Sequence, residues 1–222
     1  MTANDRYTRP LASSAALVLI DVQRDFLDLP DEGAPMPVAG TCAAIPAMAK
    51  LATAFRERRL PIVHVIRLYQ PGGSNVELVR RQSIEQGARI AVPGSAGSQI
   101  AAELLPNVVE LDHELLLAGG FQRVGAAEHV MYKPRWGAFF NTCLDRHLRE
   151  SGSDTLVFAG CNFPNCPPCV DLRGIRTRLP DCPGFGRDLR LVRPGCRRMP
   201  CHRSESLGVV GDTGLAGALA AR

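Results

Sequence analysis

The chain has 222 residues, 45% of them hydrophobic, and a formal net charge of +4 at pH 7. This size and apolar content fit one globular domain with a substantial core. The mild charge gives no basis for binding nucleic acid or an acidic membrane surface, and no apolar run approaches the roughly 20 residues that cross a bilayer. Residues 1–12 are polar and lack the pattern of a secretory signal, so we expect a cytoplasmic protein.

The first third of the chain has the pattern of a strand, a helix and a second strand. Residues 15–20 form a continuous apolar run that ends at Asp21, which is typical of a strand buried on both faces. Residues 38–58 are rich in Ala and predict a helix, with Pro46 in its early part. Residues 61–66, Pro-Ile-Val-His-Val-Ile, predict a second buried strand.

The middle of the chain is less regular. Residues 70–98 carry many Gly, Ser and Arg residues, so we expect a loop that contains a short helix at 76–86. Residues 94–105 predict a turn and a short helical stretch, and residues 108–117 fit either a strand or a helix.

Two more strands are predicted further on. Residues 129–132 form a third strand that leads into Lys133, and residues 155–159 form a fourth that closes at Gly160. Between them, residues 140–150 have the pattern of an amphipathic helix. Strands that alternate with helices predict an α/β fold of three layers, a Rossmann-like parallel sheet with helices on both faces.

This fold would gather reactive side chains at one edge of the sheet. In parallel sheets, chemistry collects at the carboxyl ends of the strands. Asp21, Lys133 and the turn from Gly160 to Cys166 each follow directly from a predicted strand. We therefore expect a carboxylate, an ammonium group and a thiol to converge there.

Three motifs at these strand ends resemble one family. Leu-Val-Leu-Ile-Asp-Val-Gln-Arg-Asp-Phe at 17–26 is similar to the first-strand signature of the isochorismatase-like hydrolases. Lys133, followed by Gly-Ala-Phe-Phe-Asn-Thr-Cys-Leu-Asp at 137–145, is similar to the family's Lys…Ser-Ala-Phe…Thr-x-Leu segment. Leu-Val-Phe-Ala-Gly-Cys-Asn-Phe-Pro-Asn-Cys at 156–166 resembles its strand and Gly-x-x-Thr-x-x-Cys turn. The resemblance runs from about residue 15 to residue 167, in the family's order.

The resemblance implies a cysteine hydrolase related to nicotinamidases and N-carbamoylsarcosine amidases. Cys166 would be the nucleophile, with its thiolate stabilised at a helix N-terminus. Asp21 would take the thiol proton and pass it to the leaving group, while Lys133 would favour the ionised forms. Backbone N–H groups of the turn would bind the oxyanion. The family's cis peptide before its Thr corresponds here to Asn162–Phe163.

Some residues depart from the family pattern. Phe163 stands where the family has Thr, and Gly137 stands where it has Ser. Both differences bear on the substrate more than on the type of reaction. Trp136 follows the Lys133 segment, and we expect it either to line the substrate pocket or to pack in the core.

Each feature also has a purely structural interpretation. Taken alone, Asp21 could cap a helix, Lys133 could lie at the surface, and Cys166 could be a small core residue. Their joint occurrence at three strand ends favours catalysis. His64 lies in an apolar strand, so a hydrogen-bonded core histidine is favoured over a ligand.

The eight cysteines raise the question of disulfides and zinc. Cys42 and Cys143 lie in helical patterns, and we interpret them as small core residues. The other six crowd residues 161–201, but a disulfide framework is typical of short secreted chains. Cys166-x-x-Cys169 has the spacing of half a zinc site, and no matching second half follows, so we expect no structural zinc.

A catalytic metal is not expected either. Some nicotinamidases of the family bind a divalent ion through an Asp-x-His pair and another His after the first strand. Between Phe26 and Ile62 the chain has no His. We therefore predict neither a metal site nor a cofactor.

The last quarter of the chain has a different character. Residues 168–222 are rich in Arg, Pro, Gly and Cys, and up to about residue 203 they show neither a helical nor a strand pattern. The resemblance implies a helix, a fifth strand ending near Asp-Ala and another helix in this part. We therefore divide the chain into a hydrolase domain, 1–167, and an atypical remainder, 168–222.

Degenerate back-translation offers an explanation for this remainder. Read one base later from residue 167 onward, the codons permit Ala-Ser-Ile-Tyr-Glu-Ala-Ser-Glu-Arg-Asp-Tyr-Arg, a helix-forming run. They then permit Val-Leu-Val-Ser-Asp-Ala, a buried strand with the implied ending. Our hypothesis is a frameshift near codon 167. It predicts a poorly folded and inactive protein if the chain is translated as it stands.

Three functions remain in competition. The first is hydrolysis of a small amide, carbamoyl or related C–N bond, with a small molecule as the partner. The second is an inactive relic or binding module on the same fold, and the third is a zinc-binding interaction protein that uses the Cys-rich part. Members of the family often oligomerise, so we also consider a homo-oligomer.

Overall fold

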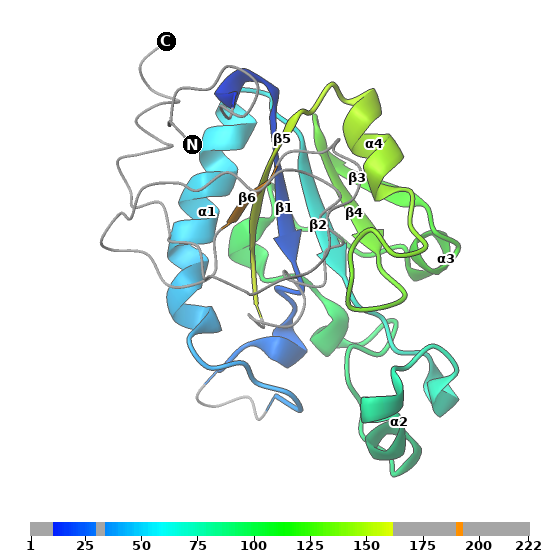
Figure 1. Cartoon of the computed structure of the whole chain (residues 1–222). Helices are drawn as coiled ribbons and strands as arrows, with labels where there is room; N and C mark the ends of the chain where they lie inside the picture. Colours follow the sequence, from blue (N-terminus) through cyan, green and yellow to red (C-terminus); the bar gives the residue numbers. More distant parts are fainter. Residues whose placement is uncertain (1–10, 30–33, 162–189, 193–222) are drawn as a thin grey trace, which may run out of the picture.

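A single mixed β-sheet forms the centre of the protein. The computed structural model describes residues 11–29, 34–161 and 190–192 (Figure 1). Within these residues the sheet has six strands in the order β3-β4-β2-β1-β5-β6. The strands are β1 (Ala15–Ile20), β2 (Ile62–Ile66), β3 (Phe121–Gly125), β4 (Glu128–Tyr132), β5 (Thr155–Gly160) and β6 (Arg190–Val192).

The four inner strands run parallel, as predicted. β1 pairs with β2 on one side and with β5 on the other, and β2 pairs with β4. The two edges differ from the prediction, because β3 is antiparallel to β4 and β6 is antiparallel to β5. The strand β6 also lies in a stretch where the sequence predicted no strand.

Helices cover both faces of the sheet. The helices of the described residues are α1 (Thr41–Glu57), α2 (Leu78–Glu85), α3 (His113–Leu117) and α4 (Leu144–Glu150). Of these, α2 lies beyond the strand ends rather than over a face of the sheet (Figure 1). Short 3-10 helices lie at Ala12–Ser14, Arg24–Phe26, Pro71–Gly73, Ala96–Ser98 and Ala102–Leu104. The predicted helices at 38–58 and 76–86 are therefore confirmed, and the ambiguous segment 108–117 contains a helix. Among the described residues, no helix combines the length and apolarity that crossing a membrane requires.

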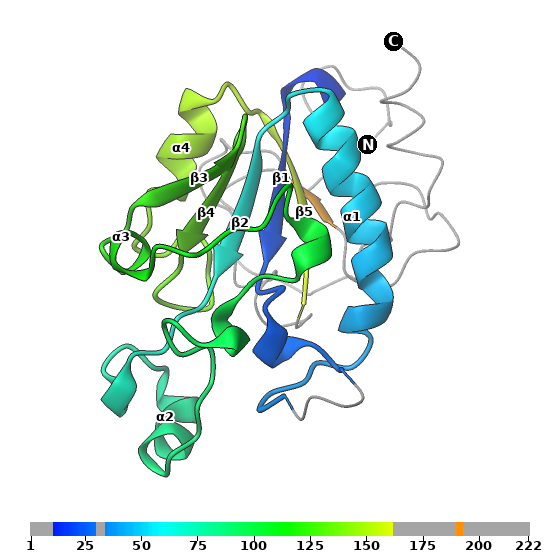
Figure 2. The same ribbon diagram turned by 180° about the vertical axis from the view of Figure 1, so that it is seen from behind.

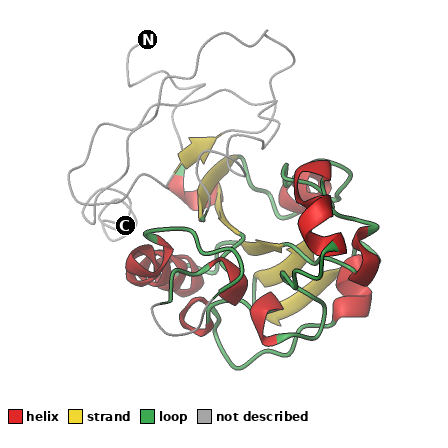
Figure 3. Ribbon diagram, turned by 90° about the horizontal axis from the view of Figure 1, so that it is seen from below, coloured by secondary structure: helices red, strands yellow, loops and turns green. Residues whose placement is uncertain are grey.

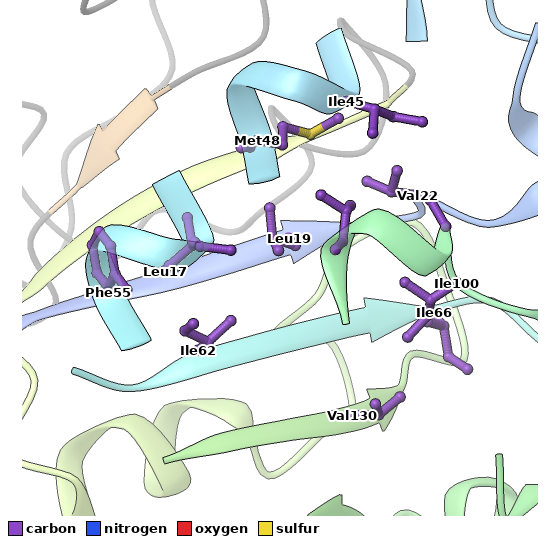
Figure 4. Packing of buried hydrophobic residues seen from close by; sticks show 14 of the residues in the cluster. Leu17, Leu19, Val22, Ile45, Met48, Phe55, Ile62, Ile66, Ile100 and Val130 are labelled. Atoms are coloured by element: carbon purple, nitrogen blue, oxygen red, sulfur yellow. The ribbon is translucent and has the colours of Figure 1, made fainter. Parts of the chain in front are cut away.

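Strand β1 shows why the fold has three layers. Helix α1 lies across one face of the sheet (Figure 2). Leu17 and Leu19 face this helix and share a core cluster with its Met48 and Phe55 (Figure 4). The alternate residues, with Val18 among them, belong to a second cluster that includes two leucines of α4. Successive side chains of a strand point to opposite faces, so an entirely apolar strand needs cover on both. Figure 3 shows helices on both sides of the strands, which confirms the predicted fold class.

The start of α4 and one cysteine correct the prediction. The helix begins at Leu144 rather than near residue 140, because Asn141 adopts a left-handed conformation with φ 50° that interrupts the helical path. Cys143 precedes the helix and is exposed, and Cys42 is only half-buried. The prediction of a core residue is therefore wrong for Cys143, whereas Cys42 packs against the edge of the core cluster that contains Met48 and Phe55.

Candidate active site

Asp21 and Lys133 meet at the carboxyl edge of the sheet. Asp21 directly follows β1, and Lys133 directly follows β4. Lys133 Nζ donates a hydrogen bond to Asp21 Oδ2 at 2.6 Å. The lysine is fully buried, and Asp21 is 4% exposed. The expected contact between the carboxylate and the ammonium group is present.

The backbone around this pair is fixed by the sheet. The Asp21 N–H bonds the carbonyl of Val65, and the Lys133 N–H bonds the carbonyl of Ile66, so the strand ladder continues past both strand ends. Asp21 has φ 56°, a left-handed conformation that Asp tolerates better than most residues. Because of this conformation, the Asp21 side chain no longer follows the alternation of side chains between the two faces of the sheet.

The buried side-chain atoms that lack a hydrogen-bond partner in the described part of the chain include two around the Asp21–Lys133 pair. They are Asp21 Oδ1 and Trp136 Nε1, and both are buried. The backbone carbonyl of Trp136 accepts a hydrogen bond from Lys133 Nζ at 3.0 Å, and its half-buried ring packs against the core cluster of α4. Because buried polar atoms are normally paired, these two atoms are candidates for contact with a reacting group or a substrate.

The turn after β5 begins in contact with Asp21. Gly160 has φ 145°, and a Cβ there would lie 2.1 Å from the Ile20 carbonyl oxygen, so only glycine fits. The next residue, Cys161, donates its thiol to the backbone carbonyl of Asp21 at 2.6 Å. Sequence reasoning treated Cys161 only as a possible zinc ligand and missed this contact.

The other predicted site residues lie outside the described residues. They are the nucleophile Cys166 and the cis-peptide residues Asn162 and Phe163. Of the cysteines considered for zinc, only Cys161 is described. The approach of the thiol to the Asp21–Lys133 pair therefore stays a prediction.

The sequence analysis also missed Arg67, a buried cation at the same edge. Arg67 directly follows β2, which lies between β1 and β4, and it is 1% exposed. One of its guanidinium nitrogens donates to the carbonyl of Lys133. Asp21 and Lys133 were selected because each directly follows a predicted parallel strand. This strand-end rule applies equally to Arg67 and could have found it.

His64 behaves as the sequence predicted. It is buried in β2, and its Nε2 lies 2.7 Å from Oε1 of Glu128. Arg56 of α1 pairs with the same carboxylate through two hydrogen bonds of 2.7 Å. This network ties α1 to the amino end of β4, away from Asp21.

Comparison with known proteins identifies the family. Residues 15–166 match the isochorismatase domain, which is most of the chain. The chain belongs to the isochorismatase family. This isochorismatase-family protein is therefore related to hydrolases, as its motifs predicted. The match ends at Cys166, one residue before the end of the hydrolase domain that the sequence predicted, 1–167.

Individual relatives agree with this assignment. The chain is 30% identical over 154 residues to the probable inactive nicotinamidase At3g16190 of Arabidopsis thaliana, covering 69% of this chain and 68% of that protein. It is 31% identical over 157 residues to the ureidoacrylate amidohydrolase RutB of Enterobacter sp., covering 66% and 62%. The chain thus spans less than two thirds of RutB.

A solved structure shows the same fold. An isochorismatase family protein from Desulfovibrio vulgaris superimposes with a TM-score of 0.57 at 33% sequence identity. The superposition covers 69% of this chain and 70% of that one.

Proposed function

We propose that this protein hydrolyses a C–N bond in a small amide or carbamoyl compound, with Cys166 as the nucleophile. The observation that carries the proposal is the buried Lys133–Asp21 pair, in which one carboxylate oxygen is held by the ammonium group and the other is without a partner among the described residues. An acceptor of this kind can take a thiol proton. The names of the amidohydrolase relatives support the same chemistry.

The reaction would proceed in two balanced steps. Asp21 takes the proton of the Cys166 thiol, and the thiolate attacks the carbonyl carbon. As the C–N bond breaks, Asp21 gives the proton to the leaving nitrogen, and the acyl group stays on sulfur as a thioester. Asp21 then takes a proton from water, and the hydroxide attacks the thioester carbonyl carbon. The C–S bond breaks, the acid leaves, and the Cys166 sulfur takes the proton back from Asp21, which restores the thiol and the carboxylate. Lys133 stabilises the carboxylate throughout.

Substrate recognition is assigned to the segment after β4. Trp136 has a buried indole N–H without a described partner, which supports a contact with an acceptor atom of the substrate. Asn162 and Phe163 would supply the oxyanion site. Gly137 leaves space where the family pattern has Ser, so we expect the substrate to differ from that of nicotinamidases.

A second candidate function is an inactive relic. One of the similar curated proteins is itself named a probable inactive nicotinamidase. A domain boundary at 167, with 168–222 as a frameshifted remainder, would also favour this candidate. This placement of the boundary is supported by the family match, which ends at residue 166. We also retain a cytoplasmic location and a homo-oligomeric state as predictions.

Thiol reactivity and hydrolysis together test the proposal. The full chain is treated with iodoacetamide at neutral pH, and labelling of Cys166 is compared with that of the exposed Cys143 by peptide mass spectrometry. The chain is also assayed on ureido acids, N-carbamoyl amino acids and nicotinamide, with Cys166→Ala as the control. Fast labelling of Cys166 and hydrolysis that Cys166→Ala abolishes are expected for the enzyme. Slow labelling and no hydrolysis identify the relic.

The frameshift has its own test. Resequencing the gene across codon 167 either finds the extra or missing base or finds the frame intact. An intact frame eliminates the hypothesis. If the lesion is present, the corrected chain is put through the same substrate panel, and it should gain activity that the uncorrected chain lacks.

A further inference from the structure

Arg67 is fixed between the two catalytic strand ends. Its backbone N–H donates to Gln23 Oε1 at 2.7 Å, and its carbonyl accepts from Gln23 Nε2 at 2.8 Å. The same amide nitrogen of Gln23 also bonds the carbonyl of Ser98 at 2.7 Å. The Gln23 side chain is fully buried, so it extends the pairing of β1 and β2 beyond their ends. Arg67 therefore leaves the sheet in a defined direction.

The guanidinium group of Arg67 joins a carbonyl to a carboxylate. Its Nη1 donates to the backbone carbonyl of Lys133. Its Nη2 lies 2.8 Å from Glu77 Oε1, and its carbon lies 4.6 Å from the centre of the Tyr69 ring. Glu77 also accepts a hydrogen bond from the Tyr69 hydroxyl at 3.0 Å. A planar group with fixed donors suits this arrangement better than an ammonium group would.

The charges around Arg67 keep it ionised. Burial alone lowers the pKa of a guanidinium, but the neighbouring Tyr69, Glu77 and Asp21 outweigh it, so the pKa of Arg67 is raised. A buried cation is retained only where a carboxylate and hydrogen bonds compensate its lost hydration. In this protein the carboxylate is that of Glu77, and one of the compensating hydrogen bonds is accepted by the backbone carbonyl of Lys133.

We propose that Arg67, held by Glu77, is a positioning residue for Lys133. The guanidinium fixes the Lys133 carbonyl, and the ammonium group at the other end of the same residue then reaches Asp21 Oδ2 and the Trp136 carbonyl. Arg67 acts on the reaction through Lys133 rather than through the substrate. This role deepens the proposed hydrolase function and rests on it.

The chain offers a matched control for this role. Arg56 makes the same two kinds of contact at the other end of the sheet, since it pairs with the Glu128 carboxylate and donates to the carbonyl of Leu104. Arg56→Met/Glu128→Gln and Arg67→Met/Glu77→Gln each remove one arginine, one carboxylate and no net charge. A merely structural role for Arg67 predicts the same consequences for both double variants.

The ammonium group itself supplies the readout. Lys50 and Lys133 are the two lysines of the chain, and Lys50 is exposed, so 15N-lysine labelling resolves them. Nζ protons that are buried and hydrogen-bonded exchange slowly with water, while those of an exposed lysine exchange rapidly. In the full chain, Lys133 should give a protected Nζ signal. The variant Lys50→Arg confirms which signal belongs to Lys133.

The expected result is a selective loss of that protection. Arg67→Met/Glu77→Gln should speed the exchange of the Lys133 Nζ protons by at least about tenfold, the effect of one lost hydrogen bond to a charged group. Arg56→Met/Glu128→Gln should leave the exchange rate unchanged. Arg67→Lys keeps the charge and remains a usable variant if the double variant fails to fold, and it should give an intermediate rate. Equal exchange rates in the unchanged chain and the Arg67 variants would overturn the proposal.

Cys166 labelling separates this proposal from the proposed function. In an active thiol hydrolase, the Arg67 variants should slow iodoacetamide labelling of Cys166 and shift its pH dependence, while the Arg56 variant should not. If Cys166 in the unchanged chain reacts no faster than Cys143, the hydrolase proposal fails. The exchange of Lys133 Nζ protons then still decides whether Arg67 positions the lysine.

Discussion

Breaking the Asp21–Lys133 pair should cost far more stability than breaking an exposed ion pair. Asp21→Asn leaves the fully buried Lys133 ammonium without its carboxylate. Removing one partner of a buried pair typically costs about 3–5 kcal/mol. Lysine can escape by losing its proton, and from a pKa of about 10.4 this costs about 4–5 kcal/mol at pH 7. Whether Lys133 stays charged without its partner or loses its proton, the free energy of unfolding should therefore fall by a similar amount. Asn also tolerates left-handed backbone, so strain at φ 56° does not confuse the comparison.

A double-mutant cycle isolates the pair. Asp21→Asn and Lys133→Met should each lower the free energy of unfolding by about 3–5 kcal/mol, whereas the double variant, which buries no charge, should lose much less than the sum. Urea unfolding at pH 7, followed by the fluorescence of Trp136, measures all four forms. The control is Glu85→Gln, which breaks the Arg81–Glu85 pair with side chains 50% and 53% exposed and should cost under about 1 kcal/mol.

Either of two results would refute this reasoning. One is a cost for Asp21→Asn as small as that of Glu85→Gln, which would mean that water reaches the pair. The other is strict additivity in the cycle, which would mean that the two groups do not stabilise each other.

Three further predictions concern the stability of the structure outside the Asp21–Lys133 pair. Gly160→Ala would force a Cβ to within 2.1 Å of the Ile20 carbonyl oxygen, so we expect a loss of at least about 1–3 kcal/mol in urea unfolding. Asp28 accepts hydrogen bonds from two backbone N–H groups at the start of α1, which lowers the pKa of Asp28 to about 2. Asp28→Ala should therefore lower the free energy of unfolding by roughly 1 kcal/mol near neutral pH. This difference from the unchanged chain should vanish as the pH falls from 3.8 through 2, because the carboxylate is then protonated. Burial lowers the pKa of His129 and of His147, whose rings lie 4.8 Å apart. As the pH falls, the unfolded chain therefore binds protons at these histidines before the folded chain does, which destabilises the folded state. The midpoint of urea unfolding should fall between pH 7 and pH 5, and it should fall less in His147→Gln.

Apolar runs were sufficient to predict the inner strands. The run that ends at Asp21 contains no polar residue, so burial on both faces was its one consistent interpretation. β3 was missed because its residues are only partly buried and it exists by pairing with β4 across a tight turn. Such an edge strand depends on its neighbour rather than on its own composition, which is why local pattern did not find it.

The site was predictable as far as the strand-end rule was applied. That rule selected Asp21 and Lys133 and placed them at one edge, and their side chains meet there. Arg67 also follows a strand directly, but the sequence analysis did not consider it. Burial of this arginine depends on Glu77 and Tyr69, which lie ten and two residues further along the chain. Nothing in the local sequence signals that these partners converge on it.

The position of the described contacts bears on how a lesion after codon 166 would act. The contacts that hold the Asp21–Lys133 pair described above come from β1, β2, β4 and the residues that follow them, all of which precede Cys166. A changed sequence after that point leaves the carboxylate and the ammonium group with these partners. What it removes is the helix that would follow Cys166 and stabilise its thiolate. We therefore expect a lesion to abolish turnover while the Lys133 Nζ signal stays protected, so that loss of activity and loss of the pair are separable events. The poorly folded chain that the sequence alone predicts would instead lose that protection.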